Sequence, residues 1–148
     1  MNPKAVNFVS ANYKAAQAAA ASINTTTANI LGLSGNESDW GGSPIAQTYN
    51  NYFGLTYPYP GNNGQYASPN GITYSIYPSP GFPNSAMGFA RGRQGRRVAA
   101  LPAISPETFA WALTAPPMAF NSLNGTFQAY VDAIGTARAA INCVFGHN

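Results

Sequence analysis

The stretch NILGLSGNESDWGGSPIAQTYNNYFGL, residues 29–55, decides how the rest of the chain is interpreted. Two of the four acidic residues, Glu37 and Asp39, lie in it. The spacing of Ile30 and Leu33 predicts a helix whose apolar side also carries Glu37. At about 100° per residue, Asp39 lies roughly 200° from Glu37 on such a helix, so the two carboxyl groups face apart unless the helix ends by residue 38.

Helical spacing recurs along the chain. Apolar residues separated alternately by three and four positions predict helices over about residues 3–23 and 124–144. Serine followed by proline is typical of a helix start and predicts two more helices, from Pro44 to about Asn50 and from Pro106 to about Thr114. Residues 56–80, rich in proline, glycine, asparagine and alternating tyrosine or isoleucine, predict a small hairpin with long turns.

The remaining segments complete an α+β prediction. Residues 84–90 are expected to form one or two helical turns, and the RGRQGRR run at residues 91–97 an exposed loop or frayed helix end. No internal repeat or linker divides the chain, so residues 1–148 are expected to form a single domain. The predicted fold is a helix-rich domain with a small inserted β-hairpin lobe flanking a cleft.

Charge is scarce in this chain. Charged residues make up 7% of it, against about 25% in an ordinary soluble domain. Aromatic residues make up 13%, which is not typical of disorder. No window approaches the roughly 18 to 20 consecutive apolar residues of a membrane span, and the N-terminus lacks the apolar core of a secretory signal peptide. A folded protein without a membrane span is therefore expected, with export by another route still open.

Counting residues argues against several chemistries. A zinc site takes about four histidine, cysteine or carboxylate ligands, and the chain has one cysteine and one histidine, so neither a metal nor a cofactor is expected. Ser34 lies in GLSG, which falls short of the G-x-S-x-G nucleophile pattern. Cys143 and His147 could meet on a helix, but Cys143 is better interpreted as a small buried hydrophobic residue.

Glu37 is the candidate catalytic residue. Cleavage of a glycosidic bond needs a carboxylic acid that stays protonated near neutral pH, and burial in a cleft achieves this by disfavouring the charged form. Glu37 precedes Trp40, and the turn at Gly41 and Gly42, which should end the helix, leaves space beside it. The alternative is a solvated carboxylate near a helix terminus, the usual environment of a glutamate.

Aromatic residues crowd the region after Glu37, and sugar rings stack on aromatic faces. The candidate substrate-binding residues are Trp40, Asn51, Tyr52, Phe53, Tyr74 and Tyr77. Alternatively, half or more of the aromatic residues belong to the core, with Trp40 and Phe53 packing against the turn.

The same stretch resembles the signature of bacterial N-acetylglucosaminidase domains of glycoside hydrolase family 73. In that signature a helix ends in Glu-Ser-x-Trp-Gly, followed by Ser-Pro-Ile-Ala and Asn-Asn-x-Phe-Gly. The matching residues, in order, are Glu37, Ser38, Trp40, Gly41, Ser43, Pro44, Ile45, Ala46, Asn50, Asn51, Phe53 and Gly54.

The resemblance implies a lysozyme-like fold that cleaves the β-1,4-linked glycan strands of peptidoglycan, with Glu37 as general acid and Tyr77 lining the site. Many family members keep an acidic residue in the β region, whereas residues 55–106 contain none. Assistance by the N-acetyl group of the substrate therefore becomes attractive. A lytic transglycosylase or muramidase is the alternative enzyme, and a glycan-binding module is the alternative without catalysis.

The chain also resembles the small glycoside hydrolase effectors that type VI secretion systems deliver as antibacterial toxins. This resemblance implies secretion or delivery to the periplasm or cell wall, and an immunity protein that occludes the cleft. A phage endolysin has the same outline. The role of Arg91, Arg93, Arg96 and Arg97 stays open between carboxylates of a peptide-bearing polymer, phosphates and water, and no nucleic-acid-binding module accompanies them.

Overall fold

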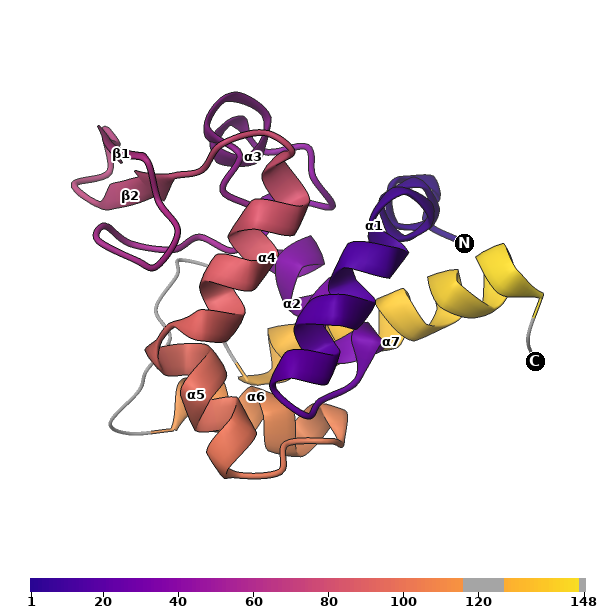
Figure 1. The fold of residues 1–148 in the computed structure, drawn as a ribbon. Coiled ribbons are helices and arrows are strands. Elements are labelled where there is room, and N and C mark those ends of the chain that lie inside the picture. The colour runs from indigo at the N-terminus through magenta and orange to yellow at the C-terminus, as the bar shows by residue number, and fades with distance from the viewer. Residues whose placement is uncertain (116–126, 147–148) are drawn as a thin grey trace.

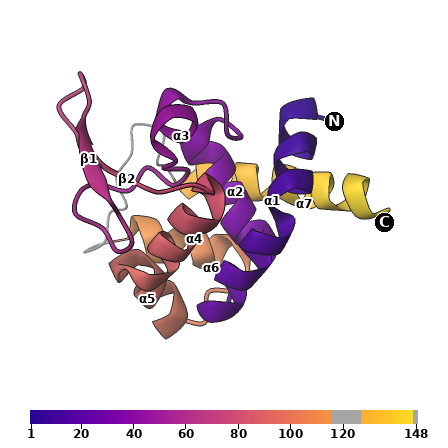
Figure 2. The same cartoon turned by 45° about the horizontal axis from the view of Figure 1, so that its top comes forward.

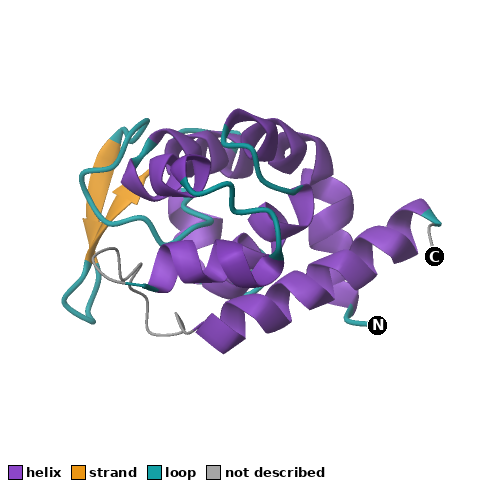
Figure 3. Ribbon diagram, turned by 90° about the horizontal axis from the view of Figure 1, so that it is seen from below, coloured by secondary structure: helices purple, strands orange, loops and turns teal. Residues whose placement is uncertain are grey.

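The computed structural model describes residues 1–115 and 127–146. A short antiparallel hairpin is inserted among helices, and in all three views it lies at the opposite end of the molecule from the C-terminal end of the last helix (Figures 1, 2 and 3). The order of elements is α1 (Pro3–Ser22), α2 (Thr27–Ser38), α3 (Pro44–Tyr49), β1 (Gly64–Ala67), β2 (Thr73–Ile76), α4 (Gly81–Arg91), α5 (Arg93–Ala100), α6 (Pro106–Thr114) and α7 (Phe127–Phe145).

Helix α2 is the central element of the helical part. Ile30, Leu31 and Leu33 are fully buried although they point in different directions around the helix, so α2 is covered on nearly all sides. Helix α7 crosses it at Gly32, where a Cβ atom would lie 2.7 Å from the backbone nitrogen of Ile134. The glycine therefore allows the two helices to pack backbone against backbone.

The predicted helix starts are confirmed by their caps. The side chain of Ser43 accepts a hydrogen bond from the backbone N–H of Ala46 at the start of α3, and Ser105 does the same for Thr108 at the start of α6. Helix α2 ends at Ser38, before the predicted glycine stop. The residue that ends it is Asp39, whose left-handed backbone (φ 52°) donates its N–H to the carbonyl of Gly35.

The hairpin lies inside the segment predicted for it. Strand β1 pairs with β2 so that Gly64 faces Ile76 and Ala67 faces Thr73. Residues 55–57 follow the other edge of β2, where the Tyr57 N–H donates to Thr73 O at 2.9 Å. The chain after α3 is thereby fixed against the hairpin over three residues.

The arginine run is helical, which corrects the prediction of a loop or frayed end. Helix α4 ends at Arg91, a single extended residue at Gly92 follows, and α5 begins at Arg93. The buried face of α5 consists of Gln94, Gly95 and Val98, only one of which is a large apolar residue. The hydrophobic repeat of α5 is therefore too weak for the sequence to predict this helix.

Two further expectations concern the end of the chain. Cys143 is exposed on α7, which corrects its interpretation as a buried hydrophobic residue. His147 lies outside the described residues. Over residues 1–115 and 127–146, no helix is long and apolar enough to cross a membrane, and no cluster of three histidine, cysteine or acidic residues could hold a metal ion.

The α2–α7 crossing gives a stability prediction. Gly32→Ala should lower the free energy of unfolding by roughly 1–3 kcal/mol, because the added methyl forces the helices apart. Gly135→Ala is the matched control, since a Cβ there meets nothing within 4 Å, and it should stabilise the protein by about 0.5–1 kcal/mol through helix propensity. Urea denaturation measures both, and equal effects of the two variants would contradict the close crossing.

Candidate active site

Glu37 lies half buried in the last turn of α2, between two elements distant in sequence. The hydroxyl of Tyr130, on α7, donates a hydrogen bond of 2.8 Å to Glu37 Oε2. On the other side is Gly54, where a Cβ atom would lie 2.9 Å from Glu37 Oε1. Gly54 also has a φ of 64°, so a side chain at this position is disfavoured both by space and by backbone conformation.

A tight reversal of the chain follows Glu37. Three successive residues, Asp39, Trp40 and Gly41, have left-handed backbones with φ of 52°, 53° and 84°. Such a conformation is uncommon for a bulky residue like Trp40, so the surroundings must hold it in place. The Ser38 hydroxyl does so from within: it donates to Ser34 O at 2.6 Å and accepts from the Gly41 N–H at 2.9 Å.

The Trp40 ring holds the reversal from outside. It covers Gly35, where no Cβ could be accommodated, and meets the Phe8 ring edge to face at 5.8 Å between centroids. The ring lines a depression of about 700 Å³ between α2 and α7, together with Asp39 and Asp132. Glu37 does not line this depression, and contact of Trp40 with substrate stays a prediction.

The other acidic side chains are not associated with Glu37. Asp39 is exposed and forms an ion pair of 2.7 Å with Lys4, on α1. Glu107, in the first turn of α6, and Asp132, on α7, are also exposed. Among the four acidic residues, all of them described, Glu37 is therefore the one whose carboxyl group is partly removed from water.

Asn51 is buried, which corrects the prediction that it holds a sugar. Its Nδ2 donates to the carbonyl oxygens of Leu55 at 2.9 Å and Ser75 at 2.8 Å. Its Oδ1 accepts from the N–H groups of Phe53 at 3.3 Å and Leu55 at 3.1 Å. All of its hydrogen-bonding capacity is spent on fixing the loop that carries Gly54.

Phe53 and Tyr77 are core residues, which likewise corrects the prediction that they contact substrate. Phe53 is fully buried and stacks on Phe89 at 5.3 Å between centroids. Tyr77 is 1% exposed, and its hydroxyl donates to Pro60 O at 3.0 Å. Burial raises the pKa of Tyr77, so its phenol stays protonated and supports the loop at Pro60 from behind.

Tyr52 and Tyr74 are half buried, and their contact with substrate stays a prediction. Tyr52 stacks on Phe8 at 6.4 Å between centroids, next to α1. Tyr74, on β2, pairs across the hairpin with Tyr66. Tyr66 in turn stacks on Tyr49, the last residue of α3, at 4.2 Å between centroids, so three neighbouring tyrosines lie where the hairpin meets α3.

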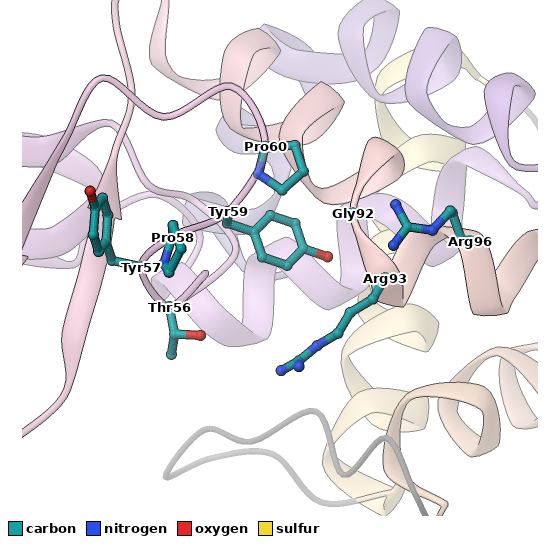
Figure 4. Close-up of a pocket in the computed structure, with 8 residues that line it drawn as sticks. All are labelled: Thr56, Tyr57, Pro58, Tyr59, Pro60, Gly92, Arg93 and Arg96. Atoms are coloured by element: carbon teal, nitrogen blue, oxygen red, sulfur yellow. The ribbon is translucent and has the colours of Figure 1, made fainter.

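Sequence reasoning missed three features near Glu37. Tyr130 lies on the apolar stripe of its helix, and nothing in the pattern shows that its hydroxyl reaches a carboxyl group 93 residues away. Gly54 belongs to the family signature, but its contact with Glu37 is visible only in three dimensions. A cavity of about 310 Å³ lies between residues 56–60 and α5, and only the clustering of arginines hinted at it (Figure 4).

Comparison with solved structures settles the family. The chain matches a structure described as a type VI secretion system effector–immunity complex from Pseudomonas protegens, with 31% identity, a TM-score of 0.80 and coverage of 96% of each chain. The chain belongs to this type VI secretion effector family. No protein-family model matches the sequence, and neither does any curated protein sequence.

More distant structures show the same fold for this effector-family chain. A peptidoglycan hydrolase from Sphingomonas sp. A1 has a TM-score of 0.70 at 17% identity, covering 94% of each chain. The glycoside hydrolase domain of FlgJ from Salmonella typhimurium has a TM-score of 0.67 at 19% identity, covering 98% of this chain and 94% of that one. The predicted lysozyme-like α+β class, with helices and a small hairpin, is confirmed.

The role found for Asn51 can be tested by stability alone. Asn51→Ala should lower the free energy of unfolding by roughly 2–4 kcal/mol, because buried carbonyl and N–H groups lose their partners. Asn63→Ala, on an exposed loop position, is the matched control and should change it by less than about 0.5 kcal/mol. Thermal or urea unfolding measures the stability of both variants. An Asn51→Ala variant as stable as wild type would show that the amide is not a structural anchor.

Proposed function

We propose that this protein is a peptidoglycan hydrolase that cleaves the β-1,4-linked glycan strand as an N-acetylglucosaminidase, with Glu37 as general acid. The observation that carries the proposal is the position of the Glu37 carboxyl group, half buried and held between the Tyr130 hydroxyl and Gly54. Membership of an effector family, with a fold that known peptidoglycan hydrolases share, supports the choice of substrate.

The two oxygens of Glu37 have different surroundings, which suggests where the catalytic proton sits. Oε2 accepts the hydrogen bond from Tyr130, so the acidic proton is best placed on Oε1. Oε1 faces Gly54, and the missing side chain leaves room for a glycosidic oxygen to approach. As the proton moves to the leaving oxygen, the Tyr130 hydroxyl stabilises the carboxylate that forms, because hydrogen bonds to a charged acceptor are stronger.

A second protein carboxylate has no suitable candidate. Retaining pairs need carboxyl groups about 5 Å apart and inverting pairs about 6.5–9.5 Å, whereas the nearest acid in sequence, Asp39, is turned toward Lys4. We therefore assign the nucleophile to the substrate: its N-acetyl oxygen bonds to the anomeric carbon while the bond to the protonated leaving oxygen breaks. Water then opens this intermediate, with the Glu37 carboxylate accepting its proton.

Delivery follows from the family. The Pseudomonas protegens protein is an effector in a complex with its immunity protein. For this chain we propose delivery to the periplasm of a competing cell as an antibacterial toxin, and a cognate immunity protein that occludes the surface beside Glu37.

Glu37→Gln tests the catalytic role. The amide cannot act as an acid, so release of reducing ends from purified walls should fall by roughly 10²–10⁴-fold with little change in stability. Asp39→Asn is the matched control, because it removes the neighbouring carboxyl group, whose ion pair is exposed, and asparagine tolerates the left-handed backbone. Its activity should stay near wild type. Full activity of Glu37→Gln, or equal loss in Asp39→Asn, would refute the assignment.

Tyr130→Phe tests how Glu37 is held. Loss of the hydroxyl removes a hydrogen bond to Oε2 and should lower kcat/KM by roughly 10–150-fold, the equivalent of one hydrogen bond to a charged group. Tyr13→Phe on α1 is the control, since its ring packs on Phe145 away from Glu37. We expect kcat to carry most of the loss in Tyr130→Phe. A loss confined to protein stability would indicate that the hydrogen bond is only structural.

Mass spectrometry of digested walls identifies the bond that is cut. N-acetylglucosamine at the reducing end supports the glucosaminidase proposal. N-acetylmuramic acid at that end would indicate a muramidase, and its anhydro form a transglycosylase. Binding of walls without release of fragments would indicate a glycan-binding module.

A further inference from the structure

The cavity beside the hairpin combines positive charge with aromatic and proline surfaces. It has a volume of about 310 Å³, and Figure 4 shows the side chains that surround it. One side is formed by the loop before the hairpin and the other by the start of α5. The lining residues are Thr56, Tyr57, Pro58, Tyr59, Pro60, Gly92, Arg93 and Arg96.

The arginines of this cavity lack a carboxylate partner within the described part of the chain, where the ion pair found is Lys4–Asp39. Arg96 uses one nitrogen, Nη1, to donate to Arg91 O at 2.8 Å. The guanidinium of Arg93 is exposed and donates to no described residue. By contrast, Arg97 outside the cavity is engaged, because its Nε donates to Ala112 O at 2.7 Å.

Tyr59 forms the inner wall and does not neutralise this charge. Its ring packs directly on Gly92, and its hydroxyl is hydrogen-bonded to the side chain and the N–H of Gln94. Burial raises the pKa of Tyr59 to about 12, although Arg93 and Arg96 act to lower it. The phenol is therefore neutral at physiological pH, and the charge of the two arginines remains available to a ligand.

The cavity is close to the candidate catalytic residue. Gly54 meets Glu37, and Thr56, two residues later, lines the cavity. Two residues of chain span at most about 7 Å. In Figure 4 the Thr56 hydroxyl and the Arg93 guanidinium both point into the space beside the Tyr59 ring. A polymer bound at Glu37 can therefore place its neighbouring groups in the cavity.

We propose that this cavity is a subsite for a carboxylate of the peptide stems of peptidoglycan, so that the protein selects peptide-bearing strands. The inference rests on the proposed function. N-acetylglucosamine itself carries no charge, whereas the stems carry free carboxylates beside the strand. A guanidinium offers paired N–H donors that match a carboxylate, and the aromatic and proline walls suit the apolar parts of a peptide.

The test pairs a change in the protein with a change in the wall. Binding is measured by sedimentation with walls free of teichoic acid, using Glu37→Gln protein to prevent digestion. One wall sample is untreated, and in the other the carboxyl groups are converted to neutral amides. Amidation should weaken binding about 5–10-fold, as expected for one or two charge-assisted hydrogen bonds at an exposed site.

Adding Arg93→Gln and Arg96→Gln should cause the same loss on untreated walls and no further loss on amidated walls. Arg91→Gln is the matched control for Arg93→Gln alone: each removes one charge from the same run, but Arg91 does not line the cavity, and its variant should keep the preference for untreated walls. Arg93→Gln alone repeats the test with a side chain that bonds to no described residue.

Several results would overturn the subsite. These are equal loss on both walls, no effect of amidation, or an Arg91→Gln variant that loses as much binding as Arg93→Gln alone. An unchanged wall preference combined with weaker binding of a cognate immunity protein would assign the arginines to that partner. Because binding is the readout, cleavage by Glu37→Gln would refute the catalytic proposal without deciding the subsite.

Discussion

The hydrogen bond from Tyr130 to Glu37 connects α7 to the end of α2 across 93 residues. Helix α7 can lie close enough for this bond because it crosses α2 at Gly32, which packs against Ile134. Ile134 is about one helical turn from Tyr130 along α7. The chain reversal at Asp39, Trp40 and Gly41 ends α2 directly after the carboxyl group. The close crossing and the abrupt helix end together keep Glu37 at an edge of the core, neither sealed inside nor free in water.

The parts that the sequence predicts are those encoded locally. Ser43, Ser105 and the prolines after them fix helix starts, because capping involves neighbouring residues. Glu37 could be singled out because it lies in a recognisable order of residues around a helix end. Helix α5 could not be predicted, because its buried face is made of Gln94, Gly95 and one valine and shows no hydrophobic repeat. Contacts with residues distant in sequence hold it in place, such as the hydrogen bonds between Gln94 and Tyr59.

The site residues show the limit more sharply. An asparagine next to aromatic residues is typical of a sugar-binding surface. It is equally typical of a buried loop, where the amide forms hydrogen bonds with backbone groups, and Asn51 has this second role. Phe53 and Tyr77 are equally ambiguous in the sequence, because an aromatic side chain suits a sugar-binding surface and a core alike. Only packing against distant residues shows that both belong to the core. Tyr130 was missed for a different reason. Its ring fits the apolar stripe of a helix, and the sequence does not show that its hydroxyl reaches Glu37.

The bonding of Tyr59 and Asn51 also bears on how the molecule moves. Asn51 ties the start of the loop to β2, and Tyr59 ties its far end to α5. A loop anchored at both ends by buried groups has little freedom to swing. The loop between Asn51 and Tyr59 should therefore keep its shape whether or not a ligand is bound. Under the proposed function, the surface beside Glu37 and the arginine cavity would already be in place when a glycan strand arrives, with no closing motion before cleavage.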